Sequence, residues 1–247
     1  MNSIEKKPLK CLKCGKPYRD KSFRYLDGFK IIPIPDCHCS KEKETKKAQE
    51  DKLKNTGIPK SFQSGAMRDW VDMPGSESCK KMIINYYSEI ENNLVSGKGL
   101  MIIGSTGVGK TKMVSALLKR IIKNHNKTGL FVSVPTMELE LSSKKEGSKE
   151  MRCYLKKMTD VDVLVLDDIV NDENSSWCNK FISMIVWSRE EDKKVTFFTS
   201  TKGVAILKNV FGDQTIGRIL SLTGRNIEIN TSKVDMRDPI NKEKYLK

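Results

Sequence analysis

The stretch "LMIIGSTGVGKTKMVSALLKRIIK" (100–123) joins three local patterns in direct succession. The uncharged apolar run "LMII" (100–103) is typical of a strand that is buried on both faces. The following "GSTGVGKT" (104–111) satisfies the pattern G-x-x-x-x-G-K-[ST]. The apolar residues of "KMVSALLKRIIK" (112–123) recur at helical spacing. The stretch therefore predicts a strand, a phosphate-binding loop and a helix.

The loop has the composition needed to surround phosphate oxygens. Its glycines let backbone N–H groups turn inward, and the N-terminus of the helix adds a partial positive charge. Lys110 is expected to reach the β and γ phosphates of ATP, and the Thr111 hydroxyl is expected to ligate Mg²⁺. The other residues of this stretch that are expected to bind ATP are Gly104, Gly107, Val108, Gly109 and Lys112.

Two acidic residues follow the apolar run "VDVLVL" (161–166). In nucleotide-binding proteins with this loop, an acid at the end of a neighbouring strand completes the Mg²⁺ shell, and we assign this role to Asp167. Asp168 would then polarise an attacking water as a general base. The alternative is that both acids only cap the next helix.

A third polar strand end follows "VTFFT" (195–199), where hydroxyl residues continue to position 201. Thr201 is the first choice for a residue that orients the water or touches the γ phosphate, and Thr199 is the second. Ordinary capping of the strand end is the alternative for both residues.

Short apolar runs alternate with spacers of helix length along the chain, starting at residue 99. This alternation predicts a parallel sheet covered by helices on both faces, and hence an α/β fold. A helix is predicted ahead of the sheet, from Glu77 to about Val95. The predicted strands are 100–103, 130–134, 161–166, 195–199 and a weaker fifth at 227–229.

Composition and charge narrow the class of protein. The 31% of charged and 38% of apolar residues are typical of a globular chain. No apolar run approaches the roughly 20 residues that cross a bilayer, and the start "MNSIEKKPLK" lacks an apolar signal core, so we expect a cytoplasmic protein without a membrane partner. Residues 1–60 hold 16 Lys or Arg against 8 Asp or Glu, which favours an anionic partner such as nucleic acid over a merely soluble surface.

Four cysteines cluster before residue 40 in the pattern C-x₂-C…C-x-C. Four thiolates can surround Zn²⁺ tetrahedrally, and such a site stabilises a module too small for a core of its own. Free thiols or an Fe–S cluster are the alternatives, and His38 could replace a neighbouring cysteine. The predicted zinc ligands are Cys11, Cys14, Cys37 and Cys39.

Several segments together resemble DnaC/DnaI-type replicative helicase loaders, a branch of the AAA+ ATPases. They are "CLKCG…CHC", "NTGIPKSFQSGAMRDW" (55–70), "GVGKT", "VLVLDDI", "SSW" and "TFFTS", in this order. The resemblance implies an AAA+ P-loop domain with a five-stranded parallel sheet. Only 18 residues follow Ile229, so we expect little or no C-terminal lid. The expected domains are a zinc-binding module (1–40), a charged linker or helix (41–60) and an AAA+ ATPase domain (61–247).

The resemblance also implies roles for three arginines. Arg218 in "TIGRIL" corresponds to an arginine finger that reaches the γ phosphate bound by a neighbouring subunit, with Arg225 as the rival for this role. Arg237 in "VDMRDP" corresponds to the arginine that contacts the subunit's own nucleotide. A surface arginine without a catalytic role is the alternative for Arg218 and Arg237.

Two departures from the family pattern point to slow hydrolysis. Asp168 stands where the family often has Glu, and Thr201 stands where it usually has Asn. The segment "TMELELSSKKEGSKE" (136–150) lies where these loaders touch single-stranded DNA, and its lysines could neutralise phosphates. A solvated loop is the alternative, and without an obvious aromatic platform we do not expect sequence-specific readout. The lysines are Lys144, Lys145 and Lys149.

These features predict an ATPase that uses ATP, Mg²⁺ and Zn²⁺, binds a replicative hexameric helicase and helps place it on single-stranded DNA. Self-association through the edge of the ATP site is expected. The alternatives are a transposition-helper ATPase of the IstB type and a nucleotide-sensing helicase adaptor with little turnover. A small-molecule P-loop kinase is disfavoured by the cysteine module and the basic charge. The sequence leaves open whether the gene is chromosomal or carried by a phage.

Overall fold

The structure is a computed structural model of the 247-residue chain. The chain divides into two compact units, Met1–Asp51 and Lys52–Lys247. In the first unit, strands β1 (Arg24–Leu26) and β2 (Phe29–Ile31) form an antiparallel pair. The described residues are 24–26, 29–31, 51–64, 77–170, 176–224 and 226–229, of which 24–26, 29–31, 77–78 and 226–229 are described by their backbone alone.

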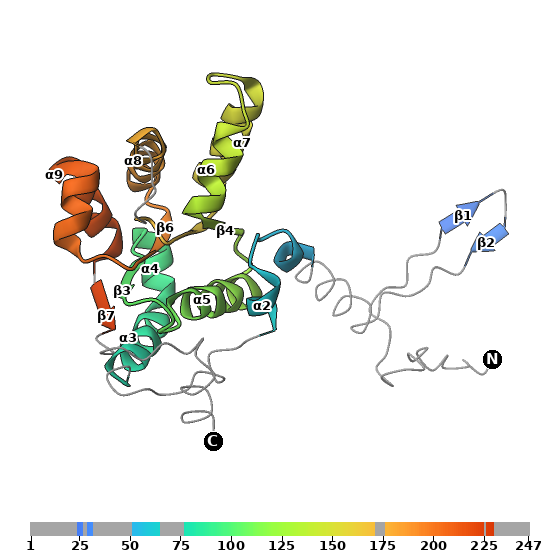
Figure 1. Cartoon of the computed structure of the whole chain (residues 1–247). Coiled ribbons are helices and arrows are strands. Elements are labelled where there is room, and N and C mark those ends of the chain that lie inside the picture. The colour runs from blue at the N-terminus through green and yellow to red at the C-terminus, as the bar shows by residue number, and fades with distance from the viewer. Residues whose placement is uncertain are drawn as a thin grey trace. The chain divides into compact units, whose positions relative to one another are not determined.

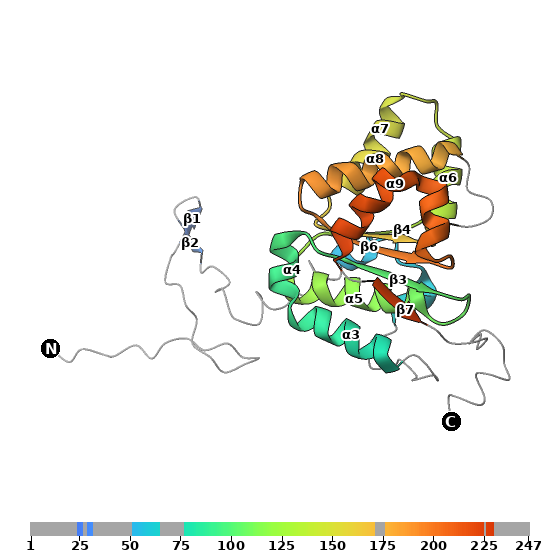
Figure 2. The same cartoon turned by 90° about the vertical axis from the view of Figure 1, so that its left-hand side faces the viewer.

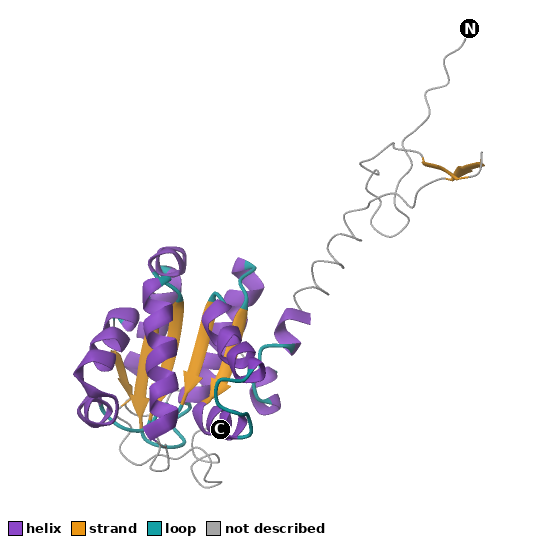
Figure 3. Cartoon of the chain, turned by 90° about the horizontal axis from the view of Figure 1, so that it is seen from above, coloured by secondary structure: helices purple, strands orange, loops and turns teal. Residues whose placement is uncertain are grey.

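A parallel sheet forms the middle layer of the second unit (Figure 3). Its strand order is β4-β5-β6-β3-β7, and all four strand pairings are parallel. The predicted parallel α/β sheet is therefore confirmed, and β3 lies inside the sheet between β6 and β7. The strands are β3 (Leu100–Gly104), β4 (Gly129–Ser133), β5 (Val163–Asp167), β6 (Val195–Ser200) and β7 (Asn226–Ile229).

Helices cover both faces of this sheet (Figures 1 and 2). Alternate residues of β3 point to opposite faces, so that Ile102 joins the core under α3, α4 and α5, whereas Met101 joins the core under α6 to α9. The helices are α2 (Lys60–Gln63), α3 (Glu77–Ser88), α4 (Ile90–Ser96), α5 (Lys110–His125), α6 (Val134–Ser142), α7 (Lys149–Asp160), α8 (Ser176–Glu191) and α9 (Val204–Thr223).

The predicted single helix from Glu77 to Val95 is wrong in one respect, because the structure breaks it at Glu89. That residue has φ −101° and ψ 17°, and its N–H donates to the carbonyl of Tyr86 in a tight turn. The side-chain amide of Asn93 also donates to this carbonyl, at 3.1 Å. A side chain that competes for a backbone carbonyl favours such a break over a continuous helix.

The segment that precedes α2 packs against the edge strand β4. The N–H of Phe131 donates to the carbonyl of Thr56 at 2.6 Å, and Ile58 is buried. Gly57 adopts φ +74°, and a Cβ there would lie 2.6 Å from the carbonyl oxygen of Phe131. Only glycine fits this close approach of two backbones. The outer edge of β4 is thus partly paired by a segment that comes well before it in the chain.

Arg189 on α8 is fully buried and joins the starts of two strands to the end of α7. Its guanidinium donates to the carbonyls of Met158, Val161 and Val195 at 2.7–2.8 Å, and to the Thr196 hydroxyl at 2.8 Å. Burial lowers the pKa of Arg189 to about 9, so the side chain remains cationic at neutral pH. The charge is compensated by carbonyl dipoles rather than by a carboxylate at hydrogen-bonding distance.

No helix in the described parts of the chain has both the length and the apolar character needed to span a membrane.

Replacing Arg189 with Met should destabilise the fold by about 3–5 kcal/mol, because it leaves several buried carbonyls without a donor. Arg152 on the exposed side of α7 provides the matched control, and Arg152→Met should change stability by no more than about 0.5 kcal/mol. Urea unfolding measures both. Equal unfolding midpoints for the two variants would contradict the structural role of Arg189.

Candidate nucleotide-binding site

The loop between β3 and α5 has the backbone geometry that the sequence predicted for it. Gly107 and Gly109 adopt φ +81° and +92°, a region in which side chains beyond glycine are strained. Val108 between them is completely buried and fixes the loop to the core. Gly109 is also the N-cap residue of α5, so the loop ends at the positive end of a helix of 16 residues.

Lys110 directs its ammonium group back into the curve of this loop. Its Nζ donates to the carbonyls of Gly104 and Ser105 at 2.8 and 2.9 Å, and the residue is only 7% exposed. A buried cation surrounded by a turn of backbone and a helix N-terminus is suited to bind an anion. The arrangement fits the phosphate groups of a nucleotide.

Asp167 lies beside the start of α5 and accepts hydrogen bonds from two hydroxyl groups. The Thr111 Oγ1 donates to both carboxylate oxygens at 3.0 and 3.1 Å, and the Thr199 Oγ1 donates to Oδ1 at 2.7 Å. Burial raises the pKa of Asp167 above its usual range, while the two hydroxyl groups and the charge of Lys110 act in the opposite direction. A carboxylate beside a hydroxyl is a donor set that suits Mg²⁺, which prefers oxygen ligands.

Asp168 turns the chain sharply away from the end of β5. It adopts φ +58°, which is uncommon for a residue other than glycine. The N–H of Asp168 donates to the Thr199 hydroxyl at 2.8 Å, and the N–H of Ile169 donates to the Thr199 carbonyl at 3.0 Å. These bonds offset a backbone strain of about 1–3 kcal/mol. The two acids therefore diverge, with Asp167 buried and Asp168 carried by the turn.

Of the two strand-end threonines, Thr199, the second choice from sequence, is the one whose hydroxyl contacts Asp167 and the N–H of Asp168. The Thr201 hydroxyl, the first choice, donates instead to the Val170 carbonyl at 3.5 Å. Strand register explains this difference. Leu166 pairs with Phe198, so the next residue along each strand brings Asp167 next to Thr199.

Arg218 makes its contacts on α8 rather than near the loop. Its guanidinium forms an ion pair with Glu190 and lies over the ring of Trp187, with Cζ 4.3 Å from the ring centroid. Arg218 follows a kink in α9 at Gly212, where φ is 78° and ψ is 164°. The side chain is 28% exposed, so part of it faces solvent.

Glu190 follows Arg189, which binds the backbone carbonyls of Asp162, just before β5, and of Val195, the first residue of β6. All strands of the sheet run in parallel, and the phosphate-binding loop follows the last residue of β3. Because they have four to six residues, the strands are about 13–20 Å long. Arg218 therefore lies toward the end of the sheet opposite to the loop of its own chain.

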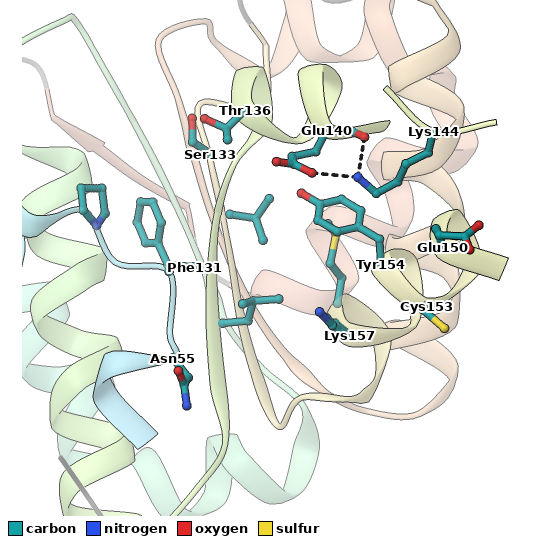
Figure 4. A pocket seen from close by; sticks show the side chains of 15 residues that line it. Asn55, Phe131, Ser133, Thr136, Glu140, Lys144, Glu150, Cys153, Tyr154 and Lys157 are labelled. Atoms are coloured by element: carbon teal, nitrogen blue, oxygen red, sulfur yellow. Dashed lines mark hydrogen bonds and ion pairs between the residues drawn. The ribbon is translucent and has the colours of Figure 1, made fainter. Parts of the chain in front are cut away.

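A cavity of about 620 Å³ lies between the β4 edge, α6 and α7 (Figure 4). It contains Lys144, whose Nζ lies 2.8 Å from Glu140 Oε2 and 5.1 Å from the centroid of the Tyr154 ring. Tyr154, which comes from the next helix, is an aromatic residue that lines the same cavity. Lys145 and Lys149 are exposed. The apolar residues of α7 recur at helical spacing, and this pattern in the sequence indicates which side of the helix faces the core.

Seven predicted site residues lie outside the described part of the chain, so their roles stay predictions. They are Cys11, Cys14, Cys37, Cys39, His38, Arg225 and Arg237.

Comparison with known proteins gives the family. Residues 88–223, more than half of the chain, match the family described as IstB-like ATP binding protein. The chain belongs to this family. The replicative helicase loader DnaI of Bacillus subtilis (strain 168) is 27% identical over 185 residues, which cover 73% of this chain and 58% of that protein. The chain thus spans less than two thirds of the length of this relative.

Solved structures of helicase loaders are also similar to this chain. The DnaC helicase loader matches with a TM-score of 0.62 and 25% identity, covering 70% of this chain and 100% of that chain. DnaI matches with a TM-score of 0.61 and 28% identity, covering 70% and 95%. DnaA from Aquifex aeolicus, at 18% identity and a TM-score of 0.55 over 76% and 55% of the chains, shares the fold. The predicted resemblance to DnaC/DnaI-type loaders and the AAA+ type of P-loop fold are confirmed.

Replacing Asp167 with Asn should stabilise the protein without ligands and remove its stabilisation by ATP and Mg²⁺. Because the folded pKa of Asp167 is raised, the ionised carboxyl group costs stability, and this cost grows as pH rises through that pKa. The advantage of the variant should therefore increase from acidic toward neutral pH. Thermal unfolding across pH, with and without ATP and Mg²⁺, measures both effects.

Asp160→Asn is the control, because Asp160 is an exposed residue that pairs with Lys156. At ATP concentrations 100 times Kd, the wild type and this control should gain about 2.7 kcal/mol, and Asp167→Asn should gain almost nothing. An Asp167→Asn protein that ATP and Mg²⁺ stabilise as fully as the control would contradict the assignment.

Proposed function

We propose that this protein is an ATP-dependent helicase loader, which binds a ring-shaped replicative helicase and helps place it on single-stranded DNA. The observation that carries the proposal is the similarity to the solved DnaC helicase loader and DnaI over 100% and 95% of those chains. The geometry around Lys110, Thr111 and Asp167 supports nucleotide binding as the energy source or gate.

The described residues suggest how ATP would be bound and hydrolysed. Lys110 neutralises charge on the β and γ phosphates, while Thr111 and Asp167 hold Mg²⁺. Mg²⁺, when bound, neutralises further charge on these phosphates. Asp168 accepts a proton from the attacking water. Thr199 keeps Asp167 oriented and fixes the turn that carries Asp168. Thr201 retains its predicted role at the strand end as the alternative to Thr199.

The proposed assembly uses Arg218 across a subunit boundary. Its distance from the phosphate loop of its own chain, at the other end of the parallel strands, supports a role at the nucleotide of another copy. A guanidinium suits the spread charge of a phosphoryl group in transfer because it offers several donors in one plane. Arg225 is the alternative for this role, and Arg237 is proposed to contact the nucleotide of its own chain.

The N-terminal part of the chain is proposed to hold the helicase. Its four clustered cysteines would bind Zn²⁺ and give this small module a stable fold. The basic charge of residues 1–60 and the lysines between α6 and α7 support contact with an anionic partner such as single-stranded DNA. The domain limits at residues 40 and 60 remain part of this proposal.

The family match favours one second function, a transposition-helper ATPase of the IstB type, since residues 88–223 match the IstB-like family. A protein of this type would bind duplex DNA, whereas a helicase loader would prefer single strands. Titration of the protein with labelled single-stranded and duplex oligonucleotides at one fixed salt concentration separates the two functions. Preference for duplex DNA would replace the loader assignment.

Native mass spectrometry of the protein with the replicative helicase of its host, ATP and a single-stranded oligonucleotide tests the loader function. We expect a complex with the helicase whose composition depends on nucleotide. Lys110→Ala is the matched variant, and it should lose the nucleotide dependence because the cation at the loop is gone. The loader function is wrong if the helicase is absent from every complex, with and without ATP.

Replacing Asp168 with Ala should lower ATP turnover by about 10²–10⁴-fold, as expected for the loss of a general base. ATP affinity should change little, because Asp167 and Lys110 remain. Steady-state hydrolysis and binding of a fluorescent ATP analogue measure the two effects. If helicase loading survives without hydrolysis, the protein acts as a nucleotide-gated adaptor and not as an enzyme.

A further inference from the structure

Three side chains on the outer surface of α8 and α9 form a cluster around Arg218. The guanidinium of Arg218 pairs with Glu190 and stacks over Trp187, whose ring is 47% exposed. The face of an indole ring attracts a guanidinium electrostatically, which favours this stacked position. Arg218 is therefore held on two sides, by an aromatic face and by a carboxylate. We call Arg218, Trp187 and Glu190 the arginine clamp.

The tryptophan of the clamp is itself fixed. Its Nε1–H donates to Glu191 Oε1 at 2.6 Å, which sets the orientation of the ring. Both Trp187 and Glu190 belong to the turn of α8 that contains the buried Arg189. Since Arg189 anchors this turn to the start of β6 and to the residues just before β5, the clamp is fixed to the core of the sheet.

The clamp leaves a cation partly exposed beside a large apolar ring. The Arg218 and Glu190 side chains are 28% and 23% exposed, so solvent reaches the pair. Exposed tryptophan and arginine are the residue types that most often dominate binding between proteins. A carboxylate carries one negative charge and two oxygens. A nucleoside triphosphate carries several negative charges, and its phosphate oxygens match the planar donors of arginine. A phosphate group presented to the clamp would thus compete with Glu190.

We propose that Trp187 and Glu190 are positioning residues that present Arg218 to the phosphates of a nucleotide bound by a second copy of this chain. Trp187 supports the guanidinium from one side, and Glu190 is the anion that the phosphate replaces. This inference rests on the proposed function, in which Arg218 acts across a subunit boundary. Glu190 then opposes association of two copies while no nucleotide is presented to Arg218. Trp187 assists ATP hydrolysis once the two copies have associated.

ATP hydrolysis measured over a range of protein concentrations tests the clamp. Glu190→Gln keeps the size of the side chain but removes its charge, so half-maximal activity should need a roughly 3–10-fold lower protein concentration. Trp187→Leu should lower the maximal rate severalfold, and Trp187→Phe should retain most of it because an aromatic face remains. The KM for ATP should stay unchanged in all three variants, because their own phosphate loops are intact.

Asp192→Asn is the matched control for Glu190→Gln. It removes one negative charge nearby on the chain, where Asp192 pairs with Lys194 at 3.4 Å and not with Arg218. Its concentration dependence should equal that of the wild type. The clamp is overturned if Glu190→Gln follows the same curve as Asp192→Asn, or if Trp187→Leu turns over ATP as fast as Trp187→Phe.

Arg218→Ala separates a failure of the clamp from a failure of the proposed function. If Arg218→Ala hydrolyses ATP like the wild type, its action across a subunit boundary is wrong, and the clamp inference fails with it. If Arg218→Ala is impaired while the Glu190 and Trp187 variants match their controls, the clamp inference alone is wrong.

Tryptophan fluorescence gives a second readout that a purely structural role would not move. The sequence has three tryptophans, so replacing Trp70 and Trp177 with Phe leaves Trp187 as the sole reporter of the clamp. ATP should change its emission at high protein concentration, and Lys110→Ala in the same background should abolish the change. Emission that ignores both ATP and protein concentration would contradict the exchange of Glu190 for phosphate.

Discussion

The contact of the Asp167 carboxylate with the hydroxyl groups of Thr111 and Thr199 is the interaction on which the nucleotide site depends. It joins the end of β5 to the end of β6 and to the first turn of α5, and so fixes three elements at one end of the sheet. The carboxylate is buried, and its raised pKa shows that its ionisation costs free energy. A site arranged in this way holds a charge that a bound cation would compensate.

The fold separates this nucleotide end of the sheet from an opposite end with different chemistry. Parallel strands bring all their carboxyl ends to one edge, and the returning helices carry Arg189 and Glu190 to the other. There, the buried Arg189 binds backbone carbonyls and stabilises the fold, while the half-buried Arg218 pairs with Glu190. Two arginines from neighbouring helices thus have unlike environments, one buried among backbone carbonyls and one paired with a carboxylate beside an indole ring at the surface.

A feature could be predicted from the sequence when the residues that determine it lie close together in the chain. The phosphate loop, its strand and its helix were predictable because adjacent residues determine them. The contact of Thr199 with Asp167 was not, since it depends on the register between β5 and β6. The break at Glu89 escaped prediction because a side-chain amide four residues later competes for the Tyr86 carbonyl. Tyr154 was missed because it comes from α7, beyond the charged segment whose pocket it lines.

The sequence by itself determined that this protein has a parallel α/β fold with a phosphate-binding loop and that it resembles helicase loaders, because short-range spacing and motif order carry this information. Only the tertiary structure decided that Thr199 supports the acidic pair and that Arg189 is part of the core. It also decided that Arg218 lies toward the far end of the sheet from its own loop, between a tryptophan and a glutamate. The physical reason is that strand register and the return path of helices depend on packing between residues far apart in the chain.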